Sequence, residues 1–244
     1  MQRLKKLSFH LIDDQVVVEA RINDIPARLI VDTGAGLNVI SPSFCKKIGC
    51  KTKGTYTGER NSGESLSVPL TTITSLALGR KTDPNVPVAI FALLDQLPSE
   101  FGRIDGMVSL QFFKQRPFTL DYKNNELIFE DEASLRTRMA KGTAFPIMLE
   151  LDRYTLSVSV RVLINGKTVG HFLVDSGTQR TNVDPAVAAP VTSLVLADAQ
   201  HIGLSHIAVL TRPAFGGGVV GSFFLKDFVT TFDLSNWRLI FNSP

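Results

Sequence analysis

Two aspartates of this chain share the same local setting. Asp32 follows the apolar run L-I-V and precedes T-G, and Asp175 follows F-L-V and precedes S-G. A carboxylate after three apolar strand residues is unfavourable unless it is solvated, paired or hydrogen-bonded. Because the setting occurs twice, at matching places in the two halves, it indicates a pseudo-twofold axis that brings both carboxyl groups together.

Two carboxyl groups across such an axis have a defined chemistry. They cannot easily both ionise, so they share one proton and titrate as a pair. The ionised member can take a proton from water while the protonated member supplies one to a leaving group. Gly34 and Gly177 would let backbone amides approach the carboxylates, and the hydroxyls of Thr33 and Ser176 could hydrogen-bond across the axis.

The residues that follow the two loops differ. Ala35 stands in the first half where Thr178 stands in the second. A threonine hydroxyl at this place can donate to a carboxylate and favour its ionised form, which alanine cannot do. We therefore expect the two aspartates to be inequivalent.

The rest of the chain repeats as well. Segments 16–22 and 156–164 alternate apolar and polar residues, which predicts two strands, and each runs into a turn, at Asn23-Asp24 and at Asn165-Gly166. Further matching segments are 73–78 with 191–196, 106–109 with 218–221, Asp121 with Asp233, and 127–129 with 239–241. Segment 130–143 is charged and weakly patterned, which is typical of a connector, and only 41–48 and 110–114 are expected to form short helices.

These motifs resemble those of the aspartic proteases. The resemblance rests on Asp32-Thr33-Gly34-Ala35 and Asp175-Ser176-Gly177-Thr178, each followed by an apolar element with glycine, at 104–109 and at 218–221. It extends over nearly the whole chain, and each copy is similar to a retropepsin-like domain, while the single-chain arrangement is similar to pepsin. One departure is Ser109, which stands where the family usually has glycine and could displace the loop around Asp32.

The resemblance implies an all-β fold of two retropepsin-like β-barrel lobes related by a pseudo-twofold axis, with few short helices. We divide the chain into an N-terminal lobe, 1–135, and a C-terminal lobe, 136–244. The stretch between the catalytic loop and segment 73–78 is longer in the first half by about one hairpin and a short helix. We place a flap over bound peptide there, within 55–66, with its tip at Gly58, Glu59, Arg60, Asn61, Ser62 and Gly63. The second lobe is expected to have no flap.

The implied activity is an aspartic endopeptidase whose catalytic residues are Asp32 and Asp175, with apolar side chains preferred around the cut. The alternative is a catalytically weak or inactive peptide-binding relic of the same fold. Asp-x-Gly also occurs at ordinary strand-end turns, and that structural interpretation is preferred for Asp121 and Asp233. Glycines 216–221 fit the dinucleotide pattern G-x-G-x-x-G, but strand character resumes too soon for the helix that such a site needs.

Composition excludes several classes of function. The 244 residues carry 26 basic and 23 acidic side chains without a long basic run, so the expected partner is a peptide or protein substrate and not a nucleic acid. The longest apolar stretch is too short to span a bilayer, and a monomer is expected. The spacing of the four histidines and two cysteines predicts no metal site and no cofactor. Cys45 and Cys50 are interpreted as two free thiols rather than a local disulfide. The sequence assigns the protein to no particular cellular compartment.

Overall fold

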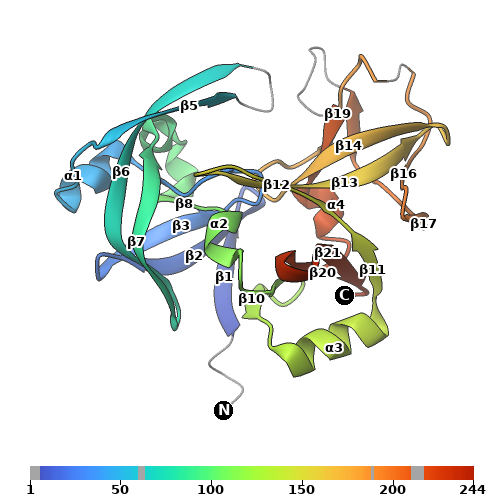
Figure 1. The fold of residues 1–244 in the computed structure, drawn as a ribbon, viewed down its shortest axis with the longest axis horizontal. Helices are drawn as coiled ribbons and strands as arrows, with labels where there is room; N and C mark the ends of the chain where they lie inside the picture. The colour runs from blue at the N-terminus through green and yellow to red at the C-terminus, as the bar shows by residue number, and fades with distance from the viewer. Residues whose placement is uncertain (1–5, 60–63, 188–189, 210–216) are drawn as a thin grey trace.

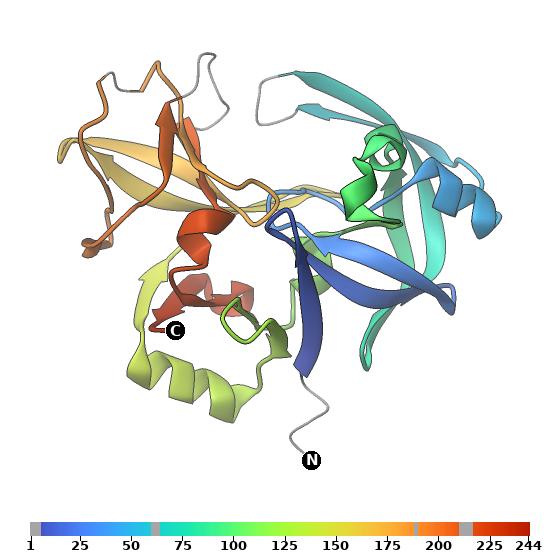
Figure 2. The same ribbon diagram turned by 180° about the vertical axis from the view of Figure 1, so that it is seen from behind.

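The protein is described by a computed structural model that covers residues 6–59, 64–187, 190–209 and 217–244. It is mostly β, and its two lobes stand side by side over a common base (Figure 1). The blue-to-cyan lobe comes from the first half of the chain and the orange lobe from the second, and helix α3 runs below them (Figures 1 and 2). The all-β, two-lobe fold expected from the sequence is confirmed.

The first lobe is a closed barrel. Its strands are β2 (Gln15–Ile22), β3 (Ile25–Val31), β8 (Gly106–Val108), β4 (Val39–Ile40), β7 (Lys81–Ile90) and β6 (Ser65–Leu78), in that spatial order, and β6 returns to pair with β2. Strand β5 (Gly54–Glu59) extends the sheet beyond β6 as an antiparallel hairpin. Alternation accounts for these strands, since Val16, Val18, Ala20 and Ile22 are buried while Glu19 and Arg21 are exposed.

The second lobe repeats much of this plan in a separate sheet of eight described strands. In spatial order they are β17 (Ala199–Gly203), β16 (Leu194–Leu196), β13 (Leu156–Ile164), β14 (Thr168–Asp175), β19 (Gly217–Gly221), β15 (Thr181–Val183) and β18 (Ile207–Val209). Strand β12 (Met148–Leu151) pairs antiparallel with the first four residues of β13. Within the described residues between β15 and β16 there is neither a hairpin nor a helix, so the length difference between the halves is accounted for by the β5–β6 hairpin and helix α1.

Two asparagines show how closely the halves correspond. The side-chain carbonyl of Asn23 accepts hydrogen bonds from the amide and hydroxyl of Thr74 and from the next amide. The side-chain carbonyl of Asn165 accepts the same three bonds from Thr192 and the residue after it. Each asparagine has a positive φ, near 50°, as a tight hairpin turn requires. The turns thus tie the β2–β3 hairpin to β6 in the first lobe and the β13–β14 hairpin to the residues just before β16 in the second.

The base is a six-stranded sheet to which both halves contribute. Its order is β11 (Thr143–Pro146), β21 (Arg238–Asn242), β20 (Val229–Asp233), β9 (Phe118–Asp121), β10 (Glu126–Phe129) and β1 (Lys6–Ile12). β9 and β20 meet antiparallel at the centre, where Thr119 lies opposite Thr231 and their hydroxyls are 2.7 Å apart. The rings of Phe118 and Phe232 stack at 4.7 Å across the same seam, so the core continues from one half into the other.

Helices are short. They are α1 (Pro42–Lys47), α2 (Leu110–Phe113), α3 (Glu132–Lys141) and α4 (Ser222–Leu225), with single 3₁₀ turns at η2 (Ala92–Gln96), η3 (Ser99–Phe101) and η4 (Leu234–Asn236). α1 and α2 lie where short helices were expected. α3 was expected only as an unpatterned connector, and its ten residues form a helix because Asp131 and Ser134 make a capping box at its start. The division proposed between 135 and 136 falls inside this helix.

The interpretation of the cysteines as free thiols is wrong. Cys45 and Cys50 form a disulfide, with their Cα atoms 5.2 Å apart. α1 ends between them, and Gly49, with φ of 66°, turns the chain back so that the amide of Cys50 donates to the carbonyl of Cys45. The helix end, which the spacing alone did not resolve, brings the two sulfurs together.

Candidate active site

Each aspartate lies at the end of a strand that has a parallel neighbour. Asp32 follows β3, and its amide donates to the carbonyl of Val108 in β8 at 3.0 Å. Asp175 is the last residue of β14 and lies opposite Gly221 of β19. The second apolar element of each half, 106–109 or 218–221, therefore fixes where its aspartate leaves the sheet.

Amides of each loop hold its carboxylate. Gly34 and Ala35 both donate to Oδ1 of Asp32 at 2.9 Å. Gly177 donates to Oδ1 of Asp175 at 2.7 Å, and the hydroxyl of Thr178 donates to the other oxygen at 2.8 Å. These donors favour the ionised form of a carboxylate. Because only the second loop adds a hydroxyl, the two aspartates differ in the way that Ala35 and Thr178 predicted.

The loops are joined across the axis by Thr33 and Ser176. The amide of Thr33 donates to Oγ of Ser176 at 3.0 Å, and the amide of Ser176 donates to Oγ1 of Thr33 at 2.9 Å. Each hydroxyl then donates at 2.8 Å to the carbonyl before the opposite aspartate, at Val174 and Val31. Both side chains are fully buried, so the two loops are held in one relative position.

The carboxyl groups fill the space that a side chain on either glycine would need. A Cβ on Gly177 would lie 2.6 Å from Cγ of Asp32, and a Cβ on Gly34 would overlap the carboxyl group of Asp175. Each aspartate thus packs against the loop of the other lobe. Only glycine fits at these two positions, because the facing carboxyl group occupies the site of the Cβ.

Burial and mutual charge set the protonation of the pair. Burial, followed by the nearby charge of Asp175, raises the pKa of Asp32 far above its ordinary range. Burial also raises the pKa of Asp175, but the hydroxyl of Thr178 and the amide of Gly177 oppose that shift. The arrangement favours one shared proton held mainly by Asp32, with Asp175 as the ionised member.

A cavity of about 270 Å³ opens beside the pair. It is lined by Asp32, Gly34, Ala35, Gly36, Leu37, Val39, Glu59, Leu66, Val68, Ala89, Phe91, Met107 and Asp175. The β5–β6 hairpin supplies Glu59, Leu66 and Val68, so this hairpin forms one wall of the cavity that contains both carboxyl groups. Of the flap residues expected from the sequence, Gly58 and Glu59 are described, and Arg60, Asn61, Ser62 and Gly63 lie outside the described residues.

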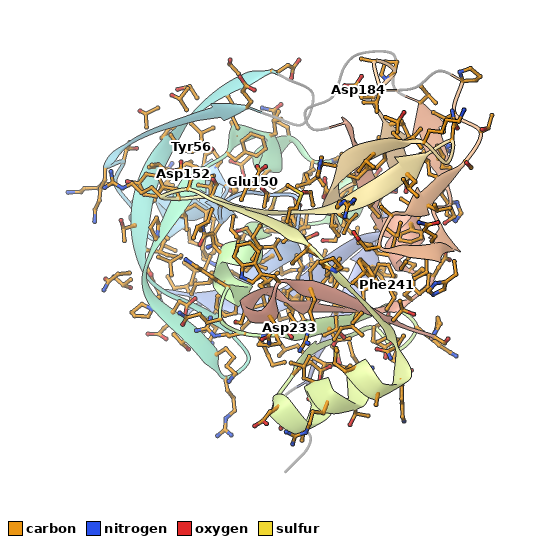
Figure 3. All side chains as sticks on the ribbon, turned by 45° about the vertical axis from the view of Figure 1, so that its right-hand side comes forward. Tyr56, Glu150, Asp152, Asp184, Asp233 and Phe241 are labelled. Atoms are coloured by element: carbon orange, nitrogen blue, oxygen red, sulfur yellow. A yellow bond between two sulfur atoms is a disulfide. The ribbon has the colours of Figure 1, made fainter. Side chains whose placement is uncertain are left out.

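The second lobe reaches into this first-lobe region, which sequence reasoning missed. The β12–β13 hairpin extends toward the first lobe, and Figure 3 labels Glu150 and Asp152 on it. The amide of Leu156 donates to the carbonyl of Gly36 at 2.8 Å. Tyr154 packs against the apolar cluster around Leu37 and Val68, together with Tyr56 of β5. No sequence signal for this contact existed, because it joins positions far apart in the chain.

A family model described as aspartyl protease matches residues 18–112. The chain has the two-lobe fold of the aspartic proteases. Among solved structures it is similar to basic 7S globulin from soybean, with a TM-score of 0.60 and 11% identity over 98% of this chain and 94% of that one. It is equally similar to conglutin gamma, a basic 7S globulin from lupine seeds, with a TM-score of 0.60 and 12% identity over 100% and 96% of the two chains. At these identities the likeness shows the fold alone, and no curated protein sequence matches the chain.

Ser109, the departure from the aspartic protease motif, fits its site. It is buried, its amide donates to the side-chain carbonyl of Asn38 at 2.9 Å, and its hydroxyl accepts from the amide of Gln111 to cap α2. The two amide bonds to Asp32 are present beside it. At the matching position, a Cβ on Gly221 would lie 2.5 Å from the carbonyl of Gln179. A side chain is therefore accommodated in the first lobe and excluded in the second.

The other repeated aspartates are structural, as expected. Asp121 accepts from the amide and side chain of Asn124, and Asp233 accepts from Asn236 and Arg238. Asp233 lies on the base sheet, away from the loops (Figure 3). No group of three or more potential metal ligands occurs in the described part of the chain, and none of its helices is long and apolar enough to cross a membrane.

Proposed function

We propose that this chain is an aspartic endopeptidase in which Asp32 and Asp175 activate one water molecule between them. The observation that carries the proposal is the paired setting of two carboxyl groups. Each is held by amides of its own loop and packs against the glycine of the other. Such a pair has an acid and a base at the same place, which is what hydrolysis by an activated water requires.

The asymmetry of the pair assigns the roles. Asp175, whose carboxylate accepts the hydroxyl of Thr178, takes a proton from the water. Asp32, which holds the shared proton, gives it to the scissile carbonyl oxygen as the water oxygen bonds to the carbonyl carbon. The tetrahedral intermediate then collapses: Asp32 takes back a proton from one of its two hydroxyls as the C=O bond reforms and the C–N bond breaks, and Asp175 passes its proton to the leaving amine. No covalent acyl intermediate forms.

The substrate is an extended peptide that lies across the pair beneath the β5–β6 hairpin. Strand-like pairing of its backbone places alternate side chains on the same side. One of them enters the 270 Å³ cavity, whose lining is largely apolar. This supports the preference for apolar residues around the cut. Since residues 1–135 and 136–244 each supply one aspartate, a single chain has the complete pair, and a monomer suffices for activity.

A peptide-binding relic is the alternative, and one observation favours it. Both similar solved structures are named as globulins and not as peptidases, and one fold can serve different functions. A relic would keep the cavity and bind peptide without cutting it. Two observations favour the enzyme. Both aspartates keep their loop hydrogen bonds, and the first lobe accommodates the side chain of Ser109 without losing those at Asp32.

The deciding experiment measures cleavage of unfolded casein by the purified chain and by its Asp32→Asn and Asp175→Asn variants. Each variant is expected to lose roughly 10²–10⁴-fold or more in turnover, because each carboxyl group has a separate proton-transfer role. Asp121→Asn, at another repeated aspartate, is the matched control and should keep its turnover. Near-normal turnover in either catalytic variant would end the two-aspartate mechanism, and peptide binding without any cleavage by the wild-type chain would establish the relic.

A further inference from the structure

The turn between β1 and β2 belongs to the first lobe but docks on the catalytic loop of the second. Asp13 and Asp14 form the turn, and both have positive φ. The side-chain amide of Gln179 donates to the carbonyl and carboxylate of Asp13 at 3.2 and 3.1 Å, and Lys226 forms an ion pair with Asp14. The next residue, Gln15, is thereby placed beside the loop that carries Asp175.

Gln15 contacts that loop at one peptide group. Its side-chain amide donates to the carbonyl oxygen of Gly177 at 2.9 Å, in a partly buried position. The same peptide group carries the amide of Thr178, which donates to the main-chain carbonyl of Asp175 at 3.4 Å. The two residues that it joins hold the Asp175 carboxylate, through the amide of Gly177 and the hydroxyl of Thr178. One peptide group thus accepts a hydrogen bond from Gln15 and lies between the two donors that hold the Asp175 carboxylate.

The described residues of the first lobe show no matching contact to the loop that carries Asp32. In its loop the matching carbonyl is that of Gly34, and among the described residues no side chain donates to it. The second lobe instead holds the first loop two residues further on, through the backbone bond from Leu156 to Gly36. The contact from Gln15 therefore adds to the asymmetry between the two aspartates. Like the hydroxyl of Thr178, it favours the ionised form of Asp175.

We propose that Gln15 is a positioning residue for Asp175: from the other lobe it holds the Gly177–Thr178 peptide group in the orientation that keeps the Gly177 amide and the Thr178 hydroxyl on the Asp175 carboxylate. The proposal rests on the proposed function only in what it says of turnover. The placement of the Asp175 carboxylate is a property of the folded protein and can be measured in a chain that cuts nothing.

The charged and titratable groups around Asp175 are few. Asp32 faces it across the axis, and Tyr122 lies within electrostatic range of both Asp175 and Asp14. Burial raises the pKa of Tyr122 above its ordinary value, so the phenol stays neutral throughout the working range. Asp14 is paired with Lys226. A change in the titration of Asp175 after substitution of Gln15 is therefore attributable to the peptide group between them or to Asp32.

The test compares Gln15→Met, which keeps the length of the side chain and removes its donor, with Gln179→Met. Gln179→Met removes the hydrogen bonds from Gln179 to Asp13 in the β1–β2 turn but leaves the bond from Gln15 to the Gly177–Thr178 peptide group in place. Carboxyl-carbon NMR of ¹³C-aspartate-labelled protein follows the titration of Asp175, assigned with Asp175→Asn. Gln15→Met should move that titration to higher pH, because the ionised form loses support, and Gln179→Met should leave it in place.

Kinetics give a second readout. Gln15→Met is expected to lower kcat about 10-fold, the equivalent of one lost hydrogen bond, with KM nearly unchanged. Gln15→Glu, which keeps the shape, should lose most activity where the new carboxylate is ionised and recover toward low pH, where it can donate again. Equal effects of Gln15→Met and Gln179→Met on the titration of Asp175, or no effect of either, would overturn the proposal. Absence of cleavage by the wild-type chain would count against the proposed function alone.

Discussion

Thr33 and Ser176 exchange two hydrogen bonds, amide to hydroxyl, across the seam between the lobes, and each hydroxyl donates a further bond to a carbonyl of the opposite lobe. Both hydroxyls are buried and both act as donor and acceptor. Removing one hydroxyl therefore leaves both an amide and a carbonyl of the opposite lobe without partners. The pair fixes the relative position of two loops that belong to opposite halves of the chain.

Ser176→Ala is expected to destabilise the protein by roughly 1–3 kcal/mol for each group left buried without a partner. Urea unfolding measures the loss. Ser176→Thr keeps the hydroxyl and copies the residue of the other loop, so its loss should be smaller. A double-mutant cycle with Thr33→Val should give a coupling energy well above zero. Additive effects of the two substitutions would show that the pair does not act as a unit.

Thr178→Ala removes the hydroxyl that donates to Asp175. The ionised form of Asp175 is then less stable, so its pKa rises and the acidic limb of the pH–rate profile should move to higher pH. The profile of kcat/KM against pH measures the shift. Ala35→Ser adds a hydroxyl at the matching place in the first lobe and should reduce the inequivalence of the pair. A profile that Thr178→Ala leaves unchanged would contradict the role given to this hydroxyl.

Asp32→Asn should make stability less dependent on pH. In the folded protein the pKa of Asp32 is raised above its ordinary value of 3.8. As pH rises above about 4, the unfolded chain loses this proton while the folded chain keeps it, so the wild type loses stability until the folded pKa is passed. Asparagine does not titrate, so the free energy of unfolding of the variant should rise relative to that of the wild type as pH increases. Urea unfolding midpoints between pH 4 and 8 test this, and parallel curves would refute it.

Substitution at Val68 should change the preferred side chain at the cut. Val68 lines the 270 Å³ cavity from strand β6 and is nearly buried. Val68→Phe narrows the cavity and should lower kcat/KM about 10-fold or more for peptides with Phe at the cut, while peptides with Ala are spared, since one or two methylene-sized clashes suffice for such discrimination. Val68→Ala should shift the preference the other way. Equal changes in kcat/KM for all peptides would show that the substrate side chain at the cut does not enter this cavity.

Sequence alone determined the features that depend on local pattern and on repetition. Alternation located β2 and β13, and the turns at Asn23 and Asn165 followed from their residue types. The repeat paired the two aspartates, because equal settings in two halves are brought together by a pseudo-twofold axis. The length difference placed the β5–β6 hairpin in the first lobe only. Each of these inferences used residues near one another in the chain, or a match between two such groups.

Only the tertiary structure decided the contacts that join unlike parts of the chain. The backbone bond from Leu156 to Gly36 and the packing of Tyr154 against the cluster around Leu37 join the second lobe to the first. The bond from Gln15 to Gly177 spans the two lobes, and the described residues of the other copy hold no equivalent of it. A repeat predicts what the halves have in common, whereas such contacts arise from how their surfaces meet, where each side chain is selected by a neighbour that is distant in sequence.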